Sequence, residues 1–286
     1  MATIWKNWKT KEKKTRRRTN NTPTTFLNPK LMITTSIAQT ITPEADCPSV
    51  AISDLTIVIP AKNEARLIPR LLESLARQDY PAMRSTRVLV ADAGSTDGTA
   101  DVVASFRDRL AVQVIPGGLP SVGRNAGAAL ADTPYVLFLD ADIELKSSSL
   151  VRRAVEAAKR KGLHCVTTNI ICRGGRLSDR TIYLGNDIFQ HLSRLHKPFS
   201  TGMFMLFDTR RFRELGGFDE RVHFAEDYHL SKRVARRKFR VVSGGVYTTN
   251  RRLERMGHAR VAGLFFATAF NFWNKKFFLR DHKYWE

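Results

Sequence analysis

The sequence has no apolar run long enough to cross a membrane. Its longest candidate, residues 261–270, falls well short of the roughly 18 residues that a bilayer requires. The N-terminus is basic, but no apolar stretch of the kind found in signal peptides follows it. We therefore expect a cytoplasmic protein, with peripheral attachment to the cytoplasmic face of a membrane as an open alternative.

Cysteine is scarce as well. The chain holds Cys47, Cys165 and Cys172, an odd and scattered set without a CxxC pair. Such a set argues against a disulfide framework and against a zinc site, and it fits a reducing compartment.

Acidic residues are outnumbered, and the net charge is +20. The excess lies at the two ends, because residues 1–30 carry nine Lys and Arg with one Glu, and residues 228–286 carry fourteen with three acids. Residues 31–227 hold 24 basic and 23 acidic side chains. This distribution favours a neutral catalytic body with basic ends, so we expect no nucleic-acid partner.

Composition divides the chain into three segments. Residues 1–50 are polar, Thr-rich and basic without helical or strand periodicity, which predicts a disordered tail. Residues 51–258 form the folded domain, and residues 259–286 interleave Phe and Trp with Lys and Arg. A second Met at position 32 leaves open whether residues 1–31 belong to the natural protein.

Strand and helix patterns alternate through the first half of the domain. Short β-branched runs predict strands at 55–60, 87–94, 111–117 and 135–140, with helical segments between them. Alternation of this kind indicates βαβ units and a parallel sheet. The second half is less regular, with a strand expected at 164–172, helices at 181–195 and 225–240, and a mixed segment at 202–220.

Three polar clusters, IPAKNE, ADAGSTD and LDAD, follow predicted strands directly. In parallel sheets ligands bind beyond the carboxyl ends of the strands, so these clusters should converge on one rim. Asp140 and Asp142 in the last cluster are oxygen ligands of the kind that Mg²⁺ or Mn²⁺ shares with substrate phosphates. An isolated DxD pair is equally compatible with a solvated turn.

Five stretches in order carry a family resemblance: IVIPAKNEARLIPRLLESL, VLVADAGSTDGTADVV, GRNAGAALADTPYVLFLDAD, GGFDE and AEDYHLSKRV. Together, over about 55–255, they resemble the inverting family 2 glycosyltransferases. The resemblance implies an α/β protein with the GT-A fold, a Rossmann-like, mostly parallel sheet flanked by helices. It implies one catalytic domain with a nucleotide half at about 51–145 and a mixed acceptor half at about 146–258. The implied activity is transfer of a hexose-type sugar from a nucleotide-sugar, with a UDP-sugar expected, to an acceptor hydroxyl.

The resemblance also assigns the donor pocket. It implies that Pro60, Ala61 and Glu64 line the nucleotide site and that Asp92 accepts a hydrogen bond from a nucleobase N–H, which suits uracil. The alternative for Asp92 is a cap of its own turn. Ala93 stands where the family often has a second acid.

The remaining donor residues surround the diphosphate. By resemblance, Asp142 ligates Mg²⁺ or Mn²⁺, and Asp140 meets the ribose or the metal-bound waters. Arg124 contacts the diphosphate or orients the DxD loop, unless it serves only solubility. Arg251 and Arg252 match the short Arg-Arg motif of non-processive members, which predicts that one sugar is added per event.

The acceptor side is implied by the ED motif. Inversion needs a general base opposite the leaving nucleotide, and the resemblance assigns this role to Asp227, with Glu226 orienting the acceptor. The alternative is a structural role only, in which the two acids stabilise a helix N-terminus.

Partners and competing functions stay open at this point. The donor is expected to be a nucleotide-sugar, and the acceptor a sugar or a lipid-linked or cell-envelope glycan. Residues 259–286 either contact an anionic membrane surface or pack on the protein's own core. A sugar-phosphate nucleotidyltransferase would need a Gly-rich loop after the first strand, where IPAKNE stands. A non-catalytic lipid- or RNA-binding protein on a transferase scaffold has no need of Asp92, Asp142 and Asp227 together.

Overall fold

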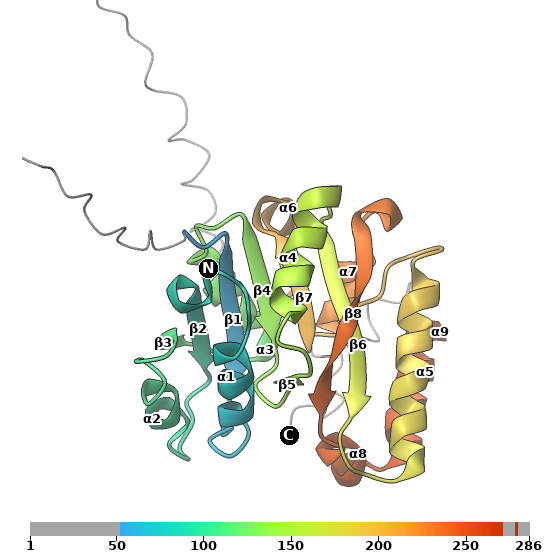
Figure 1. Ribbon diagram of the computed structural model, residues 1–286. Coiled ribbons are helices and arrows are strands. Elements are labelled where there is room, and N and C mark those ends of the chain that lie inside the picture. Colours follow the sequence, from blue (N-terminus) through green and yellow to red (C-terminus); the bar gives the residue numbers. More distant parts are fainter. Residues whose placement is uncertain (1–51, 223, 271–277, 280–286) are drawn as a thin grey trace, which may run out of the picture. The chain divides into compact units, whose positions relative to one another are not determined.

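The computed structural model describes residues 52–222, 224–270 and 278–279. The predicted N-terminal tail and most of the segment after residue 270 lie outside this part of the chain. The described strands form one sheet in the order β3-β2-β1-β4-β7-β6-β8-β5 (Figure 1). Strands of the predicted nucleotide and acceptor halves therefore share a single sheet.

The nucleotide half is a parallel sheet with helices between the strands. Its strands are β1 (Leu55–Ala61), β2 (Arg87–Asp92), β3 (Ala111–Pro116) and β4 (Tyr135–Leu139), which pair in parallel. Its helices are α1 (Ile68–Ala76), the 3-10 turn η1 (Met83–Ser85), α2 (Thr99–Ala104) and α3 (Pro120–Ala129). The predicted βαβ units are confirmed.

The acceptor half adds mixed strands. They are β5 (Glu144–Leu145), β6 (Cys165–Cys172), β7 (Phe204–Asp208) and β8 (Phe239–Thr248), with β7 antiparallel to both β4 and β6. The helices are α4 (Leu150–Lys161), α5 (Leu177–Ser193), α6 (Thr209–Glu214), α7 (Glu226–Ser231), the 3-10 turn η2 (Arg236–Lys238), α8 (Arg251–Met256) and α9 (His258–Phe270).

The two largest apolar clusters of the described residues lie on opposite faces of the sheet. Alternate residues of β1 point to opposite sides, so Ile57 packs with α1 and α4 while Val58 packs with α3 and α6. Gly127 permits α3 to lie close to β1, because a Cβ there would stand 2.3 Å from the Val58 side chain. This close packing holds the first turn of α3 near the ends of β1 and β2. None of the described helices has the length and apolarity needed to cross a bilayer.

The helix expected over residues 225–240 is wrong in extent. Helix α7 ends at Ser231, whose hydroxyl is buried and accepts a hydrogen bond from Ser200 N. A 3-10 turn follows, and β8 begins at Phe239 because Phe239 and Val241 alternate into the core beside β6. The expected helix at 181–195 starts earlier, at Leu177.

Candidate active site

A cleft of about 750 Å³ opens beyond the carboxyl ends of β1 and β4. It is lined by six of the predicted donor-site residues, namely Pro60, Ala61, Glu64, Asp140, Asp142 and Arg251. Helix α8 closes the opposite side through Arg255 and Met256. The strand-end motifs therefore converge on one rim as the sequence predicts.

The loops after β1 and β2 are locked together by side chain to backbone hydrogen bonds. Asn63 N donates to Ser95 Oγ, and Asn63 Oδ1 accepts from Thr96 N, both at 2.9 Å. Glu64 N donates to Thr99 Oγ1 at 2.9 Å. Asn63 has φ of 53°, a left-handed conformation that asparagine tolerates better than most residues. The lock fixes the direction in which Glu64 enters the cleft.

Asp92 is engaged within its own loop. Its Oδ2 accepts a 3.0 Å hydrogen bond from Ser95 N, and its Oδ1 accepts from the Ser95 hydroxyl. The cleft is lined at this end of β2 by Ala93, and Asp92 is not among the described residues that line it. The geometry is that of a turn cap, although a carboxylate oxygen with one partner still has a free lone pair.

Three carboxylates and one guanidinium face each other across the cleft. Arg251 Nη2 lies 2.6 Å from Glu64 Oε1 and 3.4 Å from Asp142 Oδ2. Burial raises the pKa of Glu64 above its ordinary value, the Arg251 hydrogen bond lowers it, and Asp142 and Asp140 add to the rise. The rim is thus an anionic site that attracts a cation, and Arg251 supplies one from the protein itself.

The donor set fits a divalent cation that is shared with a substrate. Among the described residues, no three His, Cys, Asp or Glu side chains are arranged to hold a metal ion together. Mg²⁺ is often bound by one or two carboxylates, with phosphate and water oxygens completing its shell. Asp142 and Asp140 supply that number of oxygen donors at the edge of a cleft wide enough for a nucleotide.

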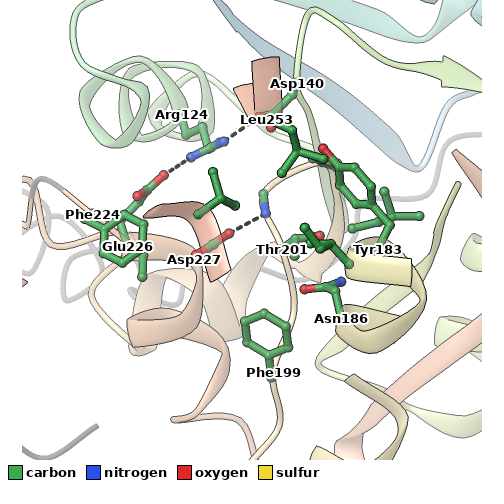
Figure 2. Close-up of a pocket in the computed structure, with 16 residues that line it drawn as sticks. Arg124, Asp140, Tyr183, Asn186, Phe199, Thr201, Phe224, Glu226, Asp227 and Leu253 are labelled. Carbon is green, nitrogen blue, oxygen red and sulfur yellow. Dashed lines mark hydrogen bonds and ion pairs between the residues drawn. The ribbon is translucent and has the colours of Figure 1, made fainter. Parts of the chain in front are cut away.

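Arg124 joins the two halves of the site beneath the cleft. Its Nη2 lies 2.6 Å from Asp140 Oδ1 and its Nη1 2.6 Å from Glu226 Oε1, as Figure 2 shows. The side chain is 1% exposed and packs over Phe218. Burial alone lowers the pKa of Arg124, but the carboxylates of Asp140 and Glu226 outweigh burial and raise it above its ordinary value. This placement matches the predicted role of orienting the DxD loop.

The same bridge needs a glycine on the facing loop. A Cβ at Gly202 would stand 2.4 Å from Arg124 Nη2, so a larger residue would displace the guanidinium. Gly202 N in turn donates a 2.6 Å hydrogen bond to Asp227 Oδ2. Gly202 therefore contacts both the bridging arginine and the predicted base.

Asp227 combines a fixed orientation with a weakly acidic carboxyl group. Its Oδ1 accepts a 2.7 Å hydrogen bond from Tyr228 N, besides the bond from Gly202. Burial raises the pKa of Asp227 to about 7, Glu226 adds to the rise, and Arg124 opposes it. A pKa near neutrality suits a general base that must accept and release protons.

The backbone before this pair is strained. Ala225, the residue before Glu226, has φ of 55° and ψ of 37°. The left-handed conformation costs an alanine about 1–2 kcal/mol. Ala225 and Asn63 are the two non-glycine residues with positive φ among the described residues, and both lie at this site. Strain of this kind persists where surrounding contacts fix the chain, and it is common at functional sites.

A smaller pocket of about 80 Å³ surrounds Asp227. Its wall includes Tyr183 and Asn186 from α5 together with Phe199 and Thr201 (Figure 2). Met203 also lines it, and the sequence singled out none of these residues as site residues. Asn186 is 8% exposed with its side-chain amide buried, and the contact of this amide with Asp187 does not reach hydrogen-bond geometry. No local motif marks these residues, because they come together only when α5 packs beside β6.

The structure brings most predicted residues to these two cavities. Asp140 lines both the cleft and the smaller pocket, and so connects the donor rim to the predicted base. Glu226 is buried against Arg124, so its carboxylate orients that arginine in this structure. The side chain of Arg252 is outside the described part of the chain.

The strand order, the diacid loop after β4 and the cleft above it define the GT-A fold of glycosyltransferases. The profile of Glycosyl transferase family 2 matches residues 56–216, more than half of the sequence. The chain belongs to this family, which confirms the family resemblance, and the matched region contains the first three motifs.

Curated relatives match over a limited region. A validoxylamine A glucosyltransferase of Streptomyces hygroscopicus subsp. jinggangensis is 43% identical over 93 residues, 31% of this chain and 22% of the relative. The poly(ribitol-phosphate) beta-N-acetylglucosaminyltransferase TarS of Staphylococcus aureus is 33% identical over 99 residues, 33% of this chain and 17% of the relative. The match thus spans about a fifth of the length of these relatives.

Solved structures share the fold more widely. TarS 1–349 with UDP-GlcNAc aligns with a TM-score of 0.55 at 21% identity, over 68% of this chain and 58% of that chain. The mannosyltransferase PcManGT from Pyrobaculum calidifontis, with GDP-Man and Mn²⁺, aligns with a TM-score of 0.57 at 24% identity, over 72% of this chain and 61% of that chain. At such identities the likeness shows the fold.

Proposed function

We propose that this protein is an inverting glycosyltransferase that moves a sugar from a UDP-sugar to an acceptor hydroxyl. The observation that carries the proposal is that Asp140, together with Tyr183 and Met203, lines both the cleft with the donor rim and the pocket around Asp227. A sugar attached to a diphosphate in the cleft then extends toward the pocket of the base. Family membership supports the same reaction class.

The residues divide the chemistry as follows. The Asp227 carboxylate takes the proton of the acceptor hydroxyl as the oxygen attacks the anomeric carbon. The bond between that carbon and the diphosphate oxygen breaks, and the diphosphate leaves with the electron pair. Gly202 N and Tyr228 N hold the carboxylate in one orientation, so little reorganisation is needed during attack.

Metal dependence is part of the proposal. When bound at Asp142 and Asp140, Mg²⁺ or Mn²⁺ supplies Lewis-acid neutralisation of the leaving diphosphate. The PcManGT complex, which contains GDP-Man and Mn²⁺, supports this reading by likeness of fold. Arg251 lies beside Glu64 and Asp142, close enough to the proposed metal ligand to turn toward a phosphate, and we assign it and Arg252 to the diphosphate.

The acceptor is inferred more broadly. We assign it to the lipid-linked or cell-envelope glycans, with peripheral attachment at the cytoplasmic face of a membrane, where residues 259–286 contribute aromatic and basic side chains. The relative TarS is named for transfer to poly(ribitol-phosphate), which supports an envelope acceptor. The nucleotidyltransferase alternative is not favoured, because the loop after β1 contains no glycine.

The experiment is a binding screen with the full-length protein. UDP, GDP and ADP and a panel of their sugar conjugates are titrated by calorimetry in Mn²⁺, in Mg²⁺ and in EDTA. The proposal expects UDP to bind at least severalfold more tightly than ADP, and expects one UDP-sugar to be hydrolysed or transferred. Equal affinity for all nucleotides, or metal-independent binding, would contradict the donor or the metal assignment respectively.

A further inference from the structure

Helix α5 has the reverse of the usual surface pattern. Its buried residues are Asp179, Tyr183, Asn186, Gln190 and Ser193, which recur at helical spacing and are all polar or hydroxyl-bearing. A helix of a soluble domain normally buries its apolar stripe and exposes its polar face. In α5 the polar face is the one that packs on the protein.

The outward face of α5 is aliphatic. Leu177, Leu184, Ile188, Leu192 and Leu195, which we call the α5 stripe, are between 52% and 77% exposed. Together with Phe189 they account for six of the ten exposed large apolar residues in the described part of the chain. Scattered apolar residues are normal on a surface, whereas a continuous stripe on one helix marks an interaction site.

The polar inner face has its own hydrogen-bond partners, which fix the rotation of α5 about its axis. Gln190 Nε2 donates a 2.9 Å hydrogen bond to Thr168 O, and Asp187 Oδ1 accepts one from Ile170 N at 2.9 Å. Asp179 accepts from Arg176 N at 2.8 Å. Turning the helix to bury its leucines would leave Thr168 O and Ile170 N without these partners inside the protein. The outward direction of the stripe is therefore fixed by hydrogen bonds.

The charges around the stripe are of one sign. Residues 176–197, all of which the structure describes, contain Arg and Lys at both ends of the helix, namely Arg176, Arg180, Arg194 and Lys197. Their two acids, Asp179 and Asp187, turn inward to the hydrogen bonds described above. The outward surface thus combines aliphatic side chains with cations and lacks an exposed acid.

Helix α9 packs against α5 (Figure 1). Its sequence over 261–270, VAGLFFATAF, contains no charged residue.

We infer that the α5 stripe docks on an anionic phospholipid bilayer, with α5 lying in the plane of the membrane interface. An amphipathic helix with leucines on one side and cations at its edges binds such surfaces by burying the leucines among the headgroups. A helix of this length presents about 25 Å of apolar edge to the lipid.

Charge argues against the other occupants. A second copy of a chain with a net charge of +20 would bring cations against the cations around the stripe. The N-terminal residues 1–30, with nine Lys and Arg and one Glu, would do the same. Single-stranded nucleic acid binds through aromatic stacking, and this stripe is mainly aliphatic. An anionic lipid surface satisfies both the leucines and the arginines.

The location of α5 links this surface to the reaction. Tyr183 and Asn186 on its inner face line the pocket around Asp227, while the α5 stripe lies on the opposite face of the same helix. Docking therefore holds the pocket about one helix diameter, roughly 10 Å, from the headgroups. The geometry assigns the acceptor to molecules that are anchored in that membrane. The assignment of the acceptor rests on the function proposed above, whereas the docking surface does not.

The test is flotation of the full-length protein with vesicles of phosphatidylcholine and phosphatidylglycerol in equal parts, and with vesicles of phosphatidylcholine alone. The variant is Leu184→Glu/Leu192→Glu. Its matched control is Ile52→Glu/Leu130→Glu, which adds the same charge at two exposed aliphatic positions outside α5. We expect the wild type and the control to bind the anionic vesicles, and the α5 variant to bind at least about tenfold more weakly.

Three outcomes would overturn the inference. The first is that the wild type does not bind the anionic vesicles, and the second is that both variants lose vesicle binding equally. The third is a dimer in solution that the α5 variant dissociates, which would show that a second copy covers the stripe. UDP binding, measured on each variant, reports folding and the proposed function separately from docking. If the glutamate variant fails to fold, Leu184→Gln/Leu192→Gln is tested in the same way.

Discussion

The Nη1 atom of Arg124 donates a 2.6 Å hydrogen bond to Oε1 of Glu226, a residue 102 positions further along the chain. The bond connects α3, which packs on the donor half, to the first residue of α7. Asp227 follows Glu226 directly, so the position of the predicted base depends on an arginine of the nucleotide half. A buried pair of this kind contributes more to geometry than to net stability.

The pair adds little net stability, but removing only the arginine should destabilise the protein strongly, because the buried carboxylates then lack a partner. Arg124→Leu leaves Asp140 and Glu226 as uncompensated charges in a buried site, and we expect the free energy of unfolding to fall by about 3–5 kcal/mol. Urea denaturation followed by circular dichroism measures it. Neutralising the partners as well, in Arg124→Leu/Asp140→Asn/Glu226→Gln, should recover most of the loss. The control Arg109→Leu removes an exposed ion pair with Glu73 and should have a much smaller effect, so equal losses would refute the argument.

Replacing the predicted base should separate binding from chemistry. Asp227→Asn keeps the side-chain shape and can still accept from Gly202 N, but it cannot take a proton at neutral pH. We expect UDP affinity within about twofold of the wild type and a rate of transfer reduced by about 10²–10⁴. Single-turnover assays with the donor identified by screening measure the rate. Asp219→Asn, at a carboxylate that pairs with Arg221 and lines neither cavity, serves as the matched control. Wild-type turnover by Asp227→Asn would remove Asp227 from the mechanism.

The raised pKa of Asp227 makes two pH predictions of opposite direction. The rate of transfer should rise as pH increases through about 7, because the active carboxylate replaces the protonated acid. Stability should change the other way, because the folded protein holds a proton on Asp227 that the unfolded chain releases at lower pH. The stabilisation is full below the unfolded pKa and is lost as pH rises through the folded pKa. Tm measured against pH in the wild type and in Asp227→Asn checks this, and parallel curves would contradict it.

Much of the donor half follows from sequence because its signals are local. LTIVIP is a continuous buried run, and YVLFL is another. Asp140 and Asp142 follow YVLFL directly, so their position after the strand places them at the rim. The contact between GRNAG and AED was not predictable in detail, since it joins residues that are distant in sequence.

The acceptor half was harder because its patterns mislead. The charged residues after Ser231 look helical, so the predicted helix ran two residues into β8. Gly244 and Gly245 obscure the pattern of the remaining strand, which was not predicted. In α5 the helix itself was expected, but an apolar stripe is normally assigned to the core. Only the hydrogen bonds of the polar face reveal that this stripe points outward. The pocket residues Tyr183 and Asn186 were missed for the same reason.

Metal binding should depend on the second acid of the DxD pair. Asp142→Asn lowers the charge of the rim, and we expect it to abolish the difference in UDP affinity between Mn²⁺ and EDTA while leaving weak metal-independent binding. Calorimetry with both conditions measures this difference. Glu144→Gln, two residues further along and paired with Arg173, is the control and should keep the metal effect. A full metal effect in Asp142→Asn would move the metal site elsewhere.

The contact between Arg251 and the two carboxylates predicts a competition. Arg251 lies on Glu64 and Asp142, so a metal ion that binds Asp142 must share or displace the guanidinium. Without UDP, Arg251→Ala should bind Mn²⁺ more tightly than the wild type, because it removes a neighbouring positive charge. With Mn²⁺ present, the same variant should bind UDP more weakly, because the guanidinium is no longer available to a phosphate. Arg255→Ala, which alters another cleft arginine, should leave Mn²⁺ binding unchanged. Tighter Mn²⁺ binding together with weaker UDP binding in this variant would show that Arg251 moves between carboxylate and phosphate. If Arg251 only closes the cleft, the Mn²⁺ affinity of the variant stays constant.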